Sequence, residues 1–146
     1  MTSEEPLAIR QFRFPEDYED VYALWAQAGA GIHLRRSDEP EEIAKKIERD
    51  PDLFLVAIAG EHIVGSIIGG FDGRRGMMYH LAVAAAYSQQ GIASQLVDEL
   101  ERRLKAKGCL RYYLLVTKNN SQAIRFYENR GWKHMNNLLA YGKDLD

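Results

Sequence analysis

Apolar and polar residues follow regular periods in the first half of the chain, and these periods predict its strands and helices. Residues 7–14 alternate apolar and polar side chains, as a half-buried strand does. Residues 15–28 place apolar side chains on one helical face, behind a proline that is tolerated in a first turn. Residues 38–50 indicate a short charged helix, and residues 52–73 predict two strands joined by a turn at 60–61.

The second half of the chain continues the alternation of strands and helices. Residues 77–83 predict a strand, and residues 91–107 carry apolar side chains at helical spacing. Residues 109–116 indicate another strand, residues 121–130 another helix, and residues 132–145 one or two closing strands. This order predicts an α/β (α+β) fold in which a mixed central sheet has helices on both faces.

The composition is that of one soluble globular domain, expected to span residues 1–146. Lys and Arg number 19 against 21 Asp and Glu, without the basic excess of a general nucleic-acid binder. The longest apolar run, residues 53–59, is too short to span a bilayer, and the acidic start lacks the apolar segment of a signal peptide. We therefore expect a cytoplasmic protein with no nucleic-acid or membrane partner.

Cysteine usage limits the chemistry further. Cys109 is the only cysteine, so neither an intrachain disulfide nor a multi-cysteine metal site is expected, and no metal is predicted. A catalytic thiol is one interpretation of Cys109, and a small buried hydrophobe beside a helix end is the more common one.

The junction before the helix at 91–107 has features of an anion site. Its first turn offers unpaired backbone N–H groups and the positive end of the helix dipole, and Gly91, Ala93 and Ser94 leave those amides uncovered. Simple capping or packing would also explain small residues there. The glycine-rich fingerprints of dinucleotide-binding and P-loop proteins are absent, which weighs against a nucleotide-binding protein of another fold.

A second motif follows the next predicted strand. On a helix that begins near Asn120, the residues Asn120, Ala123 and Tyr127 share one face, and Gly131 ends the helix before Trp132. Asn120 also suits a helix N-cap, and Tyr127 also suits a half-buried core position. The small Ala123 leaves room beside the amide and the phenol.

Together these motifs make the chain resemble the GNAT superfamily of N-acetyltransferases. That family has a Q/R-x-x-G-x-G/A loop after its fourth strand, matched by SQQGIA at residues 88–93. It also has an N-x-x-A-x-x-x-Y helix followed by G-F or G-W, matched by NSQAIRFYENRGW at residues 120–132. The element order agrees over nearly the full length, so the resemblance implies the GNAT fold. Ser88 departs from the pattern, because the family usually has Arg or Gln there, and Gln89 or Gln90 would have to compensate.

The resemblance implies acetyl-CoA as the cofactor and assigns residues to it. The loop amides would hold the pyrophosphate, the strand before the loop would pair with the pantetheine arm like an added strand, and the second motif would lie against the arm. The expected cofactor-binding residues are Leu81, Ala82, Val83, Gln89, Gln90, Gly91, Ile92, Ala93, Ser94, Asn120, Ala123 and Tyr127.

The implied activity is transfer of an acetyl group from acetyl-CoA to a primary amine. Tyr127 would act as general acid for the leaving thiolate, and the Val83 N–H would stabilise the oxyanion. Many relatives use a strand Glu as base, which neither neighbouring strand contains here, so His80 is the candidate base. Tyr79, Asp72 and a chain of waters stay open as alternatives. A non-catalytic acyl-CoA-binding or regulatory module is the alternative function.

The acceptor would lie between the first helices and the turn after the third strand. Arg35, Arg36, Arg74 and Arg75 occur in those segments and suit a carboxylate or phosphate on the acceptor. The acidic residues at 38–42 would instead suit a cationic amine, and both groups also fit ordinary solvated charges. The expected partner is a small-molecule or peptide amine, bound by a monomer or a homodimer.

Overall fold

The computed structural model describes residues 6–145, without the side chain of Ala30, and in it five strands form a single sheet. The strands are β1 (Leu7–Gln11), β2 (Phe54–Ala59), β3 (His62–Phe71), β4 (Gly76–Val83) and β5 (Tyr112–Tyr113). The α-helices are α1 (Tyr18–Ala26), α2 (Pro40–Arg49), α3 (Ile92–Ala106) and α4 (Ser121–Asn129). The described chain divides into two compact units, one ending at Leu115 and one beginning at Val116.

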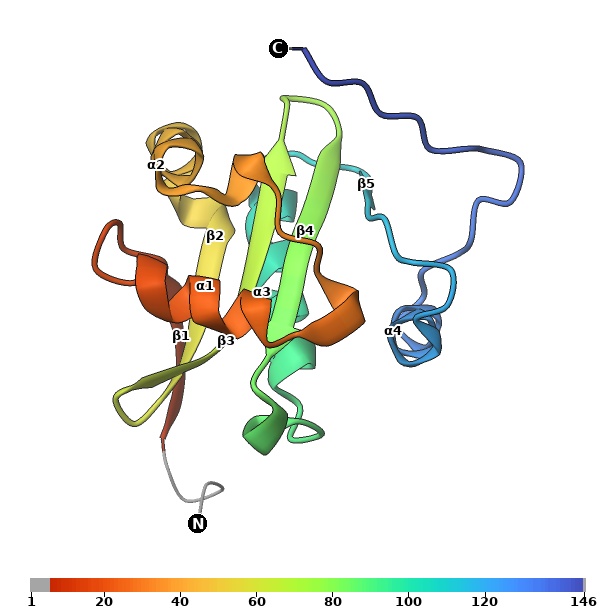
Figure 1. Cartoon of the computed structure of the whole chain (residues 1–146). Helices are drawn as coiled ribbons and strands as arrows, with labels where there is room; N and C mark the ends of the chain where they lie inside the picture. Colours follow the sequence, from red (N-terminus) through yellow and green to blue (C-terminus); the bar gives the residue numbers. More distant parts are fainter. Residues whose placement is uncertain (1–5, 146) are drawn as a thin grey trace. The chain divides into compact units, whose positions relative to one another are not determined.

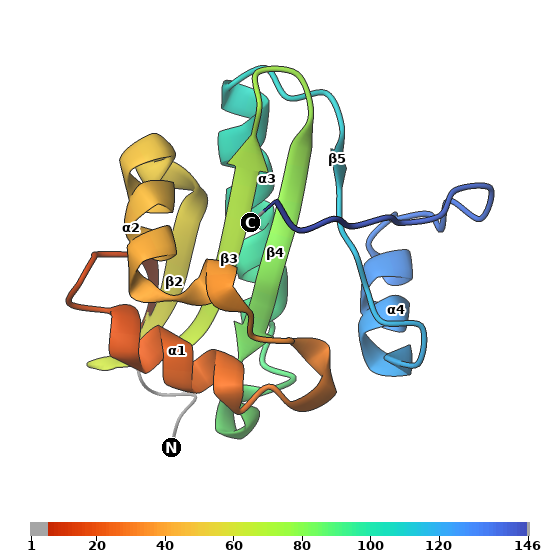
Figure 2. The same cartoon turned by 45° about the horizontal axis from the view of Figure 1, so that its top comes forward.

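The sheet belongs to the first unit and has the order β1-β2-β3-β4-β5. Neighbouring strands pair antiparallel, except β4 and β5, which pair parallel (Figure 1). Helices α1 and α2 cover one face of the sheet and α3 covers the other, as the views in Figures 1 and 2 agree. The mixed sheet with helices on both faces is therefore confirmed.

The α3 face of the sheet is packed with aliphatic side chains. Leu96 and Leu100 of α3 are fully buried against β3. They come so close to the strand that a Cβ at Gly69 would collide with the Leu100 side chain. Glycine at this position thus lets the Leu100 side chain lie directly against the strand, and a larger residue would force that side chain to move.

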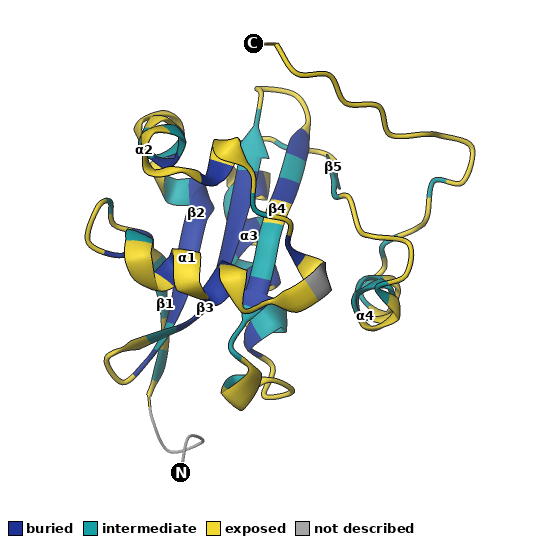
Figure 3. Cartoon of the chain, viewed as in Figure 1, coloured by how far each residue is buried: buried dark blue, intermediate teal, exposed yellow. Residues whose placement is uncertain are grey.

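The opposite face combines a large apolar cluster with buried polar groups. Trp25 of α1 stacks on Phe54 of β2, whose ring also stacks on Phe12 at a centroid distance of 4.1 Å. The Trp25 indole Nε1 donates to the Ser66 hydroxyl at 3.0 Å, and Ser66 has no exposed surface. Figure 3 shows β2 and β3 buried between the two helical layers.

Two expectations from the sequence are wrong near the ends of elements. The helix predicted over 15–28 begins at Tyr18, because the Asp17 carboxylate accepts from Arg13 N at 2.8 Å and from Arg10 Nη1 at 2.7 Å and so holds a turn before the helix. The strand predicted over 109–116 shrinks to Tyr112–Tyr113, since only these residues pair with β4.

The closing strands predicted over 132–145 do not form in the described chain. Apolar side chains there remain exposed, with Leu139 at 80% and Tyr141 at 90%. A strand needs a neighbouring backbone with which to pair, and local alternation of side chains does not supply one.

Two further expectations concern the whole chain. The acidic start at residues 1–5 lies outside the described residues, and the single domain over 1–146 stays a prediction. Within the part of the chain that the structure describes, no helix combines the length and apolar character needed to cross a membrane.

Candidate active site

The C-terminal half of β4 has an open backbone edge. Pairing with β5 is confined to Gly76 and Met77, so the strands separate beyond that point. The Ala84 N–H donates to Val64 O at 2.8 Å and therefore points toward β3. Because backbone N–H groups alternate in direction along a strand, the Val83 N–H points the opposite way, toward the open edge.

The loop between β4 and α3 presents its backbone to open space. Gln89 and Gly91 both have left-handed backbone, with φ of 60° and 82°, and a Cβ at Gly91 would meet no atom within 4 Å. The hydrogen-bond ladder of α3 begins with Gln95 N donating to Gly91 O at 3.1 Å. The amides of Ile92, Ala93 and Ser94 precede that first bond, at the positive end of the helix dipole.

The side chains of this loop leave the amides accessible. Ser88 turns its hydroxyl back onto Ala85 O at 2.9 Å, within its own turn. Gln89, Gln90 and Gly91 are exposed. Backbone donors, a helix N-terminus and free space beside Gly91 together fit the pyrophosphate that the sequence predicts for this loop.

A β-bulge in β4 redirects His80. Across β3, Ser66 pairs with Ala82 but Ile68 pairs with Tyr79, so β4 contains one extra residue between these pairs. His80 occupies this bulge with a left-handed φ of 52°, which is unusual for a residue other than glycine. Its ring meets Trp25 edge-on at 4.8 Å and therefore lies on the face covered by α1.

Asp38 holds the His80 ring from a distant part of the chain. This carboxylate is 6% exposed and lies in the short 3-10 helix Arg36–Asp38 before α2. Its Oδ1 is 2.8 Å from His80 Nε2, and its Oδ2 accepts from Arg35 N at 3.0 Å. The Tyr18 hydroxyl donates to the backbone oxygen of Asp38 at 2.8 Å and fixes the segment.

Sequence reasoning placed Asp38 in a group of acids for a cationic amine and missed its contact with His80. The two residues are 42 positions apart and lie in elements joined by tertiary packing. The short acidic run around Asp38 gave no signal of this pair.

The other two side chains considered as bases have unfavourable environments. Partial burial raises the pKa of Tyr79, so its hydroxyl stays protonated at neutral pH. Hydrogen bonds from the backbone of Arg75 and then of Arg74 lower the pKa of Asp72, which weakens it as a proton acceptor. These two environments weigh against Tyr79 and Asp72 as bases.

A hollow of about 700 Å³ opens beside the N-terminal half of β4. We call it the α2–β4 hollow, and its lining comes from α2, the end of β3, the following turn, the start of β4 and β5. Of the four arginines predicted to bind an acceptor, Arg75 lines it. The other cations there are Lys46 and Arg49 of α2, which sequence reasoning did not single out.

The remaining predicted arginines lie elsewhere in the same unit. Arg74 is exposed in the turn between β3 and β4. Arg35 and Arg36 are exposed at the start of the short helix that carries Asp38. Of the four predicted arginines, the lining of the hollow therefore includes Arg75 alone.

The second unit contains the other motif. Asn120 caps α4, because its Oδ1 accepts from Ala123 N at 3.2 Å. The Tyr127 ring packs edge-on against Phe126 at 5.3 Å and Trp132 at 5.7 Å. Burial raises the pKa of Tyr127 to about 12, so the hydroxyl is protonated at neutral pH.

The remaining candidates for chemistry are the Cys109 thiol and a metal site. Cys109 is partly buried, and its thiol donates to Arg111 O at 3.3 Å. Within the described residues, no group of three or more His, Cys, Asp or Glu side chains is arranged to hold a metal ion.

The geometry agrees with comparisons to known proteins. The sequence model of the Acetyltransferase (GNAT) family matches residues 13–132. Acetyltransferase SG1711 of Sodalis glossinidius is 41% identical over 140 residues, which cover 95% of this chain and 96% of that protein. Acetyltransferase ECA0875 of Pectobacterium atrosepticum is 42% identical over 140 residues, with the same two coverages of 95% and 96%.

A solved structure extends the comparison to three dimensions. The paiA N-acetyltransferase of Thermoplasma acidophilum, crystallised with coenzyme A, superposes with a TM-score of 0.77 at 26% identity. The match covers 88% of this chain and 90% of that one. With a family model that spans most of the sequence and relatives above 40% identity, the chain belongs to the GNAT acetyltransferase family.

Proposed function

We propose that this protein is an N-acetyltransferase that moves an acetyl group from acetyl-CoA to a primary amine. The observation that carries the proposal is the open β4 edge running directly into an exposed, left-handed loop at the start of α3. The family and the coenzyme A complex of a structural relative support acetyl-CoA as donor. The family match crosses from the first unit into the second, which supports a single catalytic domain.

Backbone groups supply most of the proposed cofactor contacts. The amides from Gln89 to Ser94 hold the pyrophosphate, since they surround free space at the positive end of α3. The edge of Leu81, Ala82 and Val83 pairs with the pantetheine arm as an added strand would. Asn120, Ala123 and Tyr127 of α4 are proposed as further cofactor residues because the family motif includes them. When bound, the cofactor supplies an acetyl thioester activated for attack by an amine.

Val83 is the proposed oxyanion donor. Its N–H points to the open edge, is fixed by the antiparallel pairing of Val83 with Gly65, and needs no rearrangement to donate to an acyl oxygen. A preoriented backbone donor of this kind is a strong source of catalysis.

His80 is the proposed general base, with Asp38 as its positioning residue. An ionised carboxylate only accepts hydrogen bonds, so His80 Nε2 carries the proton in its contact with Asp38 Oδ1. His80 Nδ1 is then the nitrogen that accepts a proton from the acceptor amine. The bulge holds the ring in this orientation from the backbone side.

Tyr127 is the proposed general acid. Its raised pKa keeps the hydroxyl protonated at neutral pH, so it can donate to the departing thiolate. Replacing Tyr127 by Phe should lower kcat by about 100-fold while leaving the KM for acetyl-CoA nearly unchanged. A core role alone would instead lower the melting temperature and leave kcat unaffected, so both are measured on one preparation.

The direct test of the function is incubation with acetyl-CoA and a panel of primary amines, with release of free thiol as the readout. Gly91→Glu should abolish coenzyme A binding in a folded protein, because the side chain would enter the free space and oppose the pyrophosphate. Unchanged affinity in this variant would contradict the placement of the cofactor.

A non-catalytic acyl-CoA-binding module is the second candidate. Ser88 favours it, because its hydroxyl bonds within its own turn at a position where the family usually has a longer side chain. Calorimetric binding of coenzyme A without acetylation of any amine would support the module, and turnover of one amine would exclude it.

A further inference from the structure

The α2–β4 hollow has an aromatic wall. Phe71, Tyr79 and Tyr113 line it from three different strands or strand ends, and Tyr79 is 46% exposed. A Cβ at Gly70 would lie 3.7 Å from the Tyr79 ring and 3.8 Å from Lys46 Nζ, so the glycine keeps the floor between them open. The volume of about 700 Å³ is in the range of small-molecule sites.

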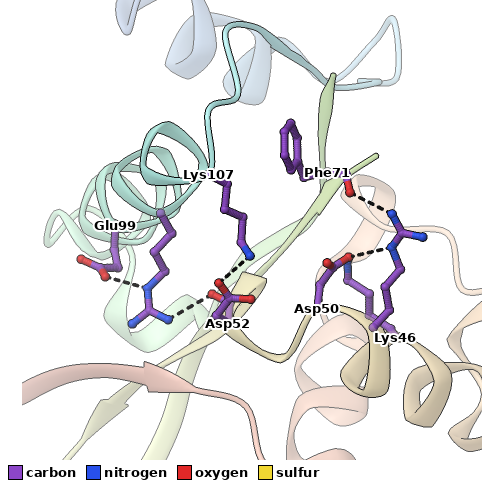
Figure 4. Close-up of polar contacts among 8 residues, drawn as sticks. Lys46, Asp50, Asp52, Phe71, Glu99 and Lys107 are labelled. Carbon is purple, nitrogen blue, oxygen red and sulfur yellow. Dashed lines mark hydrogen bonds and ion pairs between the residues drawn. The ribbon is translucent and has the colours of Figure 1, made fainter. Parts of the chain in front are cut away.

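The charges around the hollow leave an excess of positive charge. Lys46 and Arg49 share one carboxylate oxygen, Asp50 Oδ2, at 3.0 and 3.2 Å, and Arg49 also donates to Phe71 O (Figure 4). Asp50 is thus occupied by two cations and is largely buried. Neither cation is fully neutralised by a partner of its own.

Arg75 adds a third cation, and Asp72 is the second carboxylate of the lining. Asp72 Oδ1 accepts hydrogen bonds from the backbone N–H groups of Arg74 and Arg75 at 2.8 Å each, which hold the turn between β3 and β4. The Arg75 guanidinium lies 5.9 Å over the Tyr113 ring, and no carboxylate of the described chain pairs with it. The three cations of the lining therefore outnumber its two carboxylates, and the hollow keeps an excess of positive charge.

The bulge in β4 connects the hollow to the proposed base. Tyr79 pairs with Ile68, which belongs to the core under α1, so Tyr79 lies on the α1 face. His80 lies on the same face, since it contacts Trp25 and Asp38. Two consecutive residues share this face because of the extra residue. From Gly76 to His80 the strand rises about 13 Å, longer than an α-amino acid.

We infer that the α2–β4 hollow binds the distal part of the acceptor and selects amines that carry a ring and, at the far end, an anionic group. The inference rests on the proposed function and names its substrate class. Arg75, Lys46 and Arg49 bind the anion, the aromatic wall packs on the ring, and the amine reaches His80. An α-amino acid is too short to span both places.

The test uses three two-ring amines of equal length that differ in distal charge: 4′-(aminomethyl)biphenyl-4-carboxylate, 4′-(aminomethyl)biphenyl-4-carboxamide and 4,4′-bis(aminomethyl)biphenyl. A second ring is needed because one ring alone is too short for the rise of about 13 Å between His80 and the far end of the hollow. The expected order of kcat/KM follows the charge, with the carboxylate at least about tenfold above the dibasic amine. Arg75→Gln should lower kcat/KM for the carboxylate about tenfold and should hardly change it for the carboxamide.

Lys46→Gln should act in the same direction as Arg75→Gln, and Lys45→Gln is its matched control. Lys45 neighbours it on α2 but has a side chain 70% exposed, against 20% for Lys46. Equal turnover of the three amines, or a preference for the dibasic one, would overturn the inference and leave the proposed function standing.

Calorimetric titration with 4′-(aminomethyl)biphenyl-4-carboxylate measures binding in the α2–β4 hollow without any acetyl transfer. Binding that weakens in Arg75→Gln but not in Lys45→Gln supports the hollow even if no amine is acetylated, and that result would count against the proposed function alone. Absence of both binding and transfer would overturn both.

Discussion

The two faces of the central sheet are built for different tasks. The α3 face packs Leu96, Leu100 and other aliphatic side chains closely against the strands, and Leu100 occupies the space that a Cβ at Gly69 would need. The α1 and α2 face is also densely packed, but it contains the Trp25–Ser66 hydrogen bond and the Asp38–His80 pair. Burial of apolar side chains alone stabilises the folded state. Burial of hydrogen-bonded polar pairs also fixes the orientation of their side chains, so the second face can position catalytic groups.

The largest expected effect on stability comes from the aliphatic face. Leu100→Ala should lower the free energy of unfolding by about 3 kcal/mol, since it removes a fully buried side chain and leaves a cavity beside Gly69. Denaturant unfolding measures the loss. The kinetic constants of the folded variant should match those of the parent. A fall in kcat as well would contradict the idea that the α3 face serves stability alone.

Substitutions on the face covered by α1 and α2 should change the rate of the reaction more than the stability. In His80→Gln the amide can still donate to Asp38 Oδ1, but it cannot take a proton, so kcat should fall about 100-fold, or about 2.7 kcal/mol of activation free energy. The melting temperature should stay near the parent value. Full activity of this variant would remove His80 from the mechanism.

Asp38→Asn separates positioning from proton transfer. It should lower kcat about tenfold without changing the KM for acetyl-CoA, because partners that orient an active group typically contribute on that scale. A change confined to stability would assign Asp38 a purely structural role.

The smallest effect is expected at the outer edge of α3. Hydrogen bonds from Arg102 and then Arg103 lower the pKa of Glu99 to about 2, and Arg103 also donates to Asp52 O while Lys107 pairs with Asp52 (Figure 4). Since the folded pKa lies below the unfolded value of 4.5, this stabilisation is present above pH 4.5 and is lost as the pH falls toward 2.

Glu99→Gln should therefore cost less than about 1 kcal/mol at pH 7, because the pair is partly exposed and screened. The difference from the parent protein should vanish near pH 2, as measured by unfolding at both pH values. A constant difference across that range would show that packing of the side chain, and not its charge, accounts for the effect.

Local patterns predicted the regular elements well where burial enforces them. The hairpin turn at Gly60, the helix after Gly91 and the cap at Asn120 all follow from periodicity and from residue types that suit turns and helix ends. The closing strands over 132–145 failed for the complementary reason. Their alternation was present, but pairing is a property of two segments, and one segment does not reveal its partner.

The candidate site divides in the same way. The loop at Gly91 could be predicted, because helix dipoles and small side chains act over a few residues. The Asp38–His80 pair could not, since it depends on a bulge that turns His80 and on a short helix 42 residues earlier. The α2–β4 hollow could not be predicted either, because its cations line one space only when α2, β3, β4 and β5 lie side by side.

The sequence by itself determined the order of elements as far as α4, the loop that can receive an anion and the family, because these depend on short-range periodicity and on motifs of contiguous residues. Tertiary structure decided which strand edge stays open, which face His80 joins and which cations line the hollow. Those features arise where segments distant in the chain pack together, and contacts of that kind are set by the register and separation of strands that no local pattern specifies.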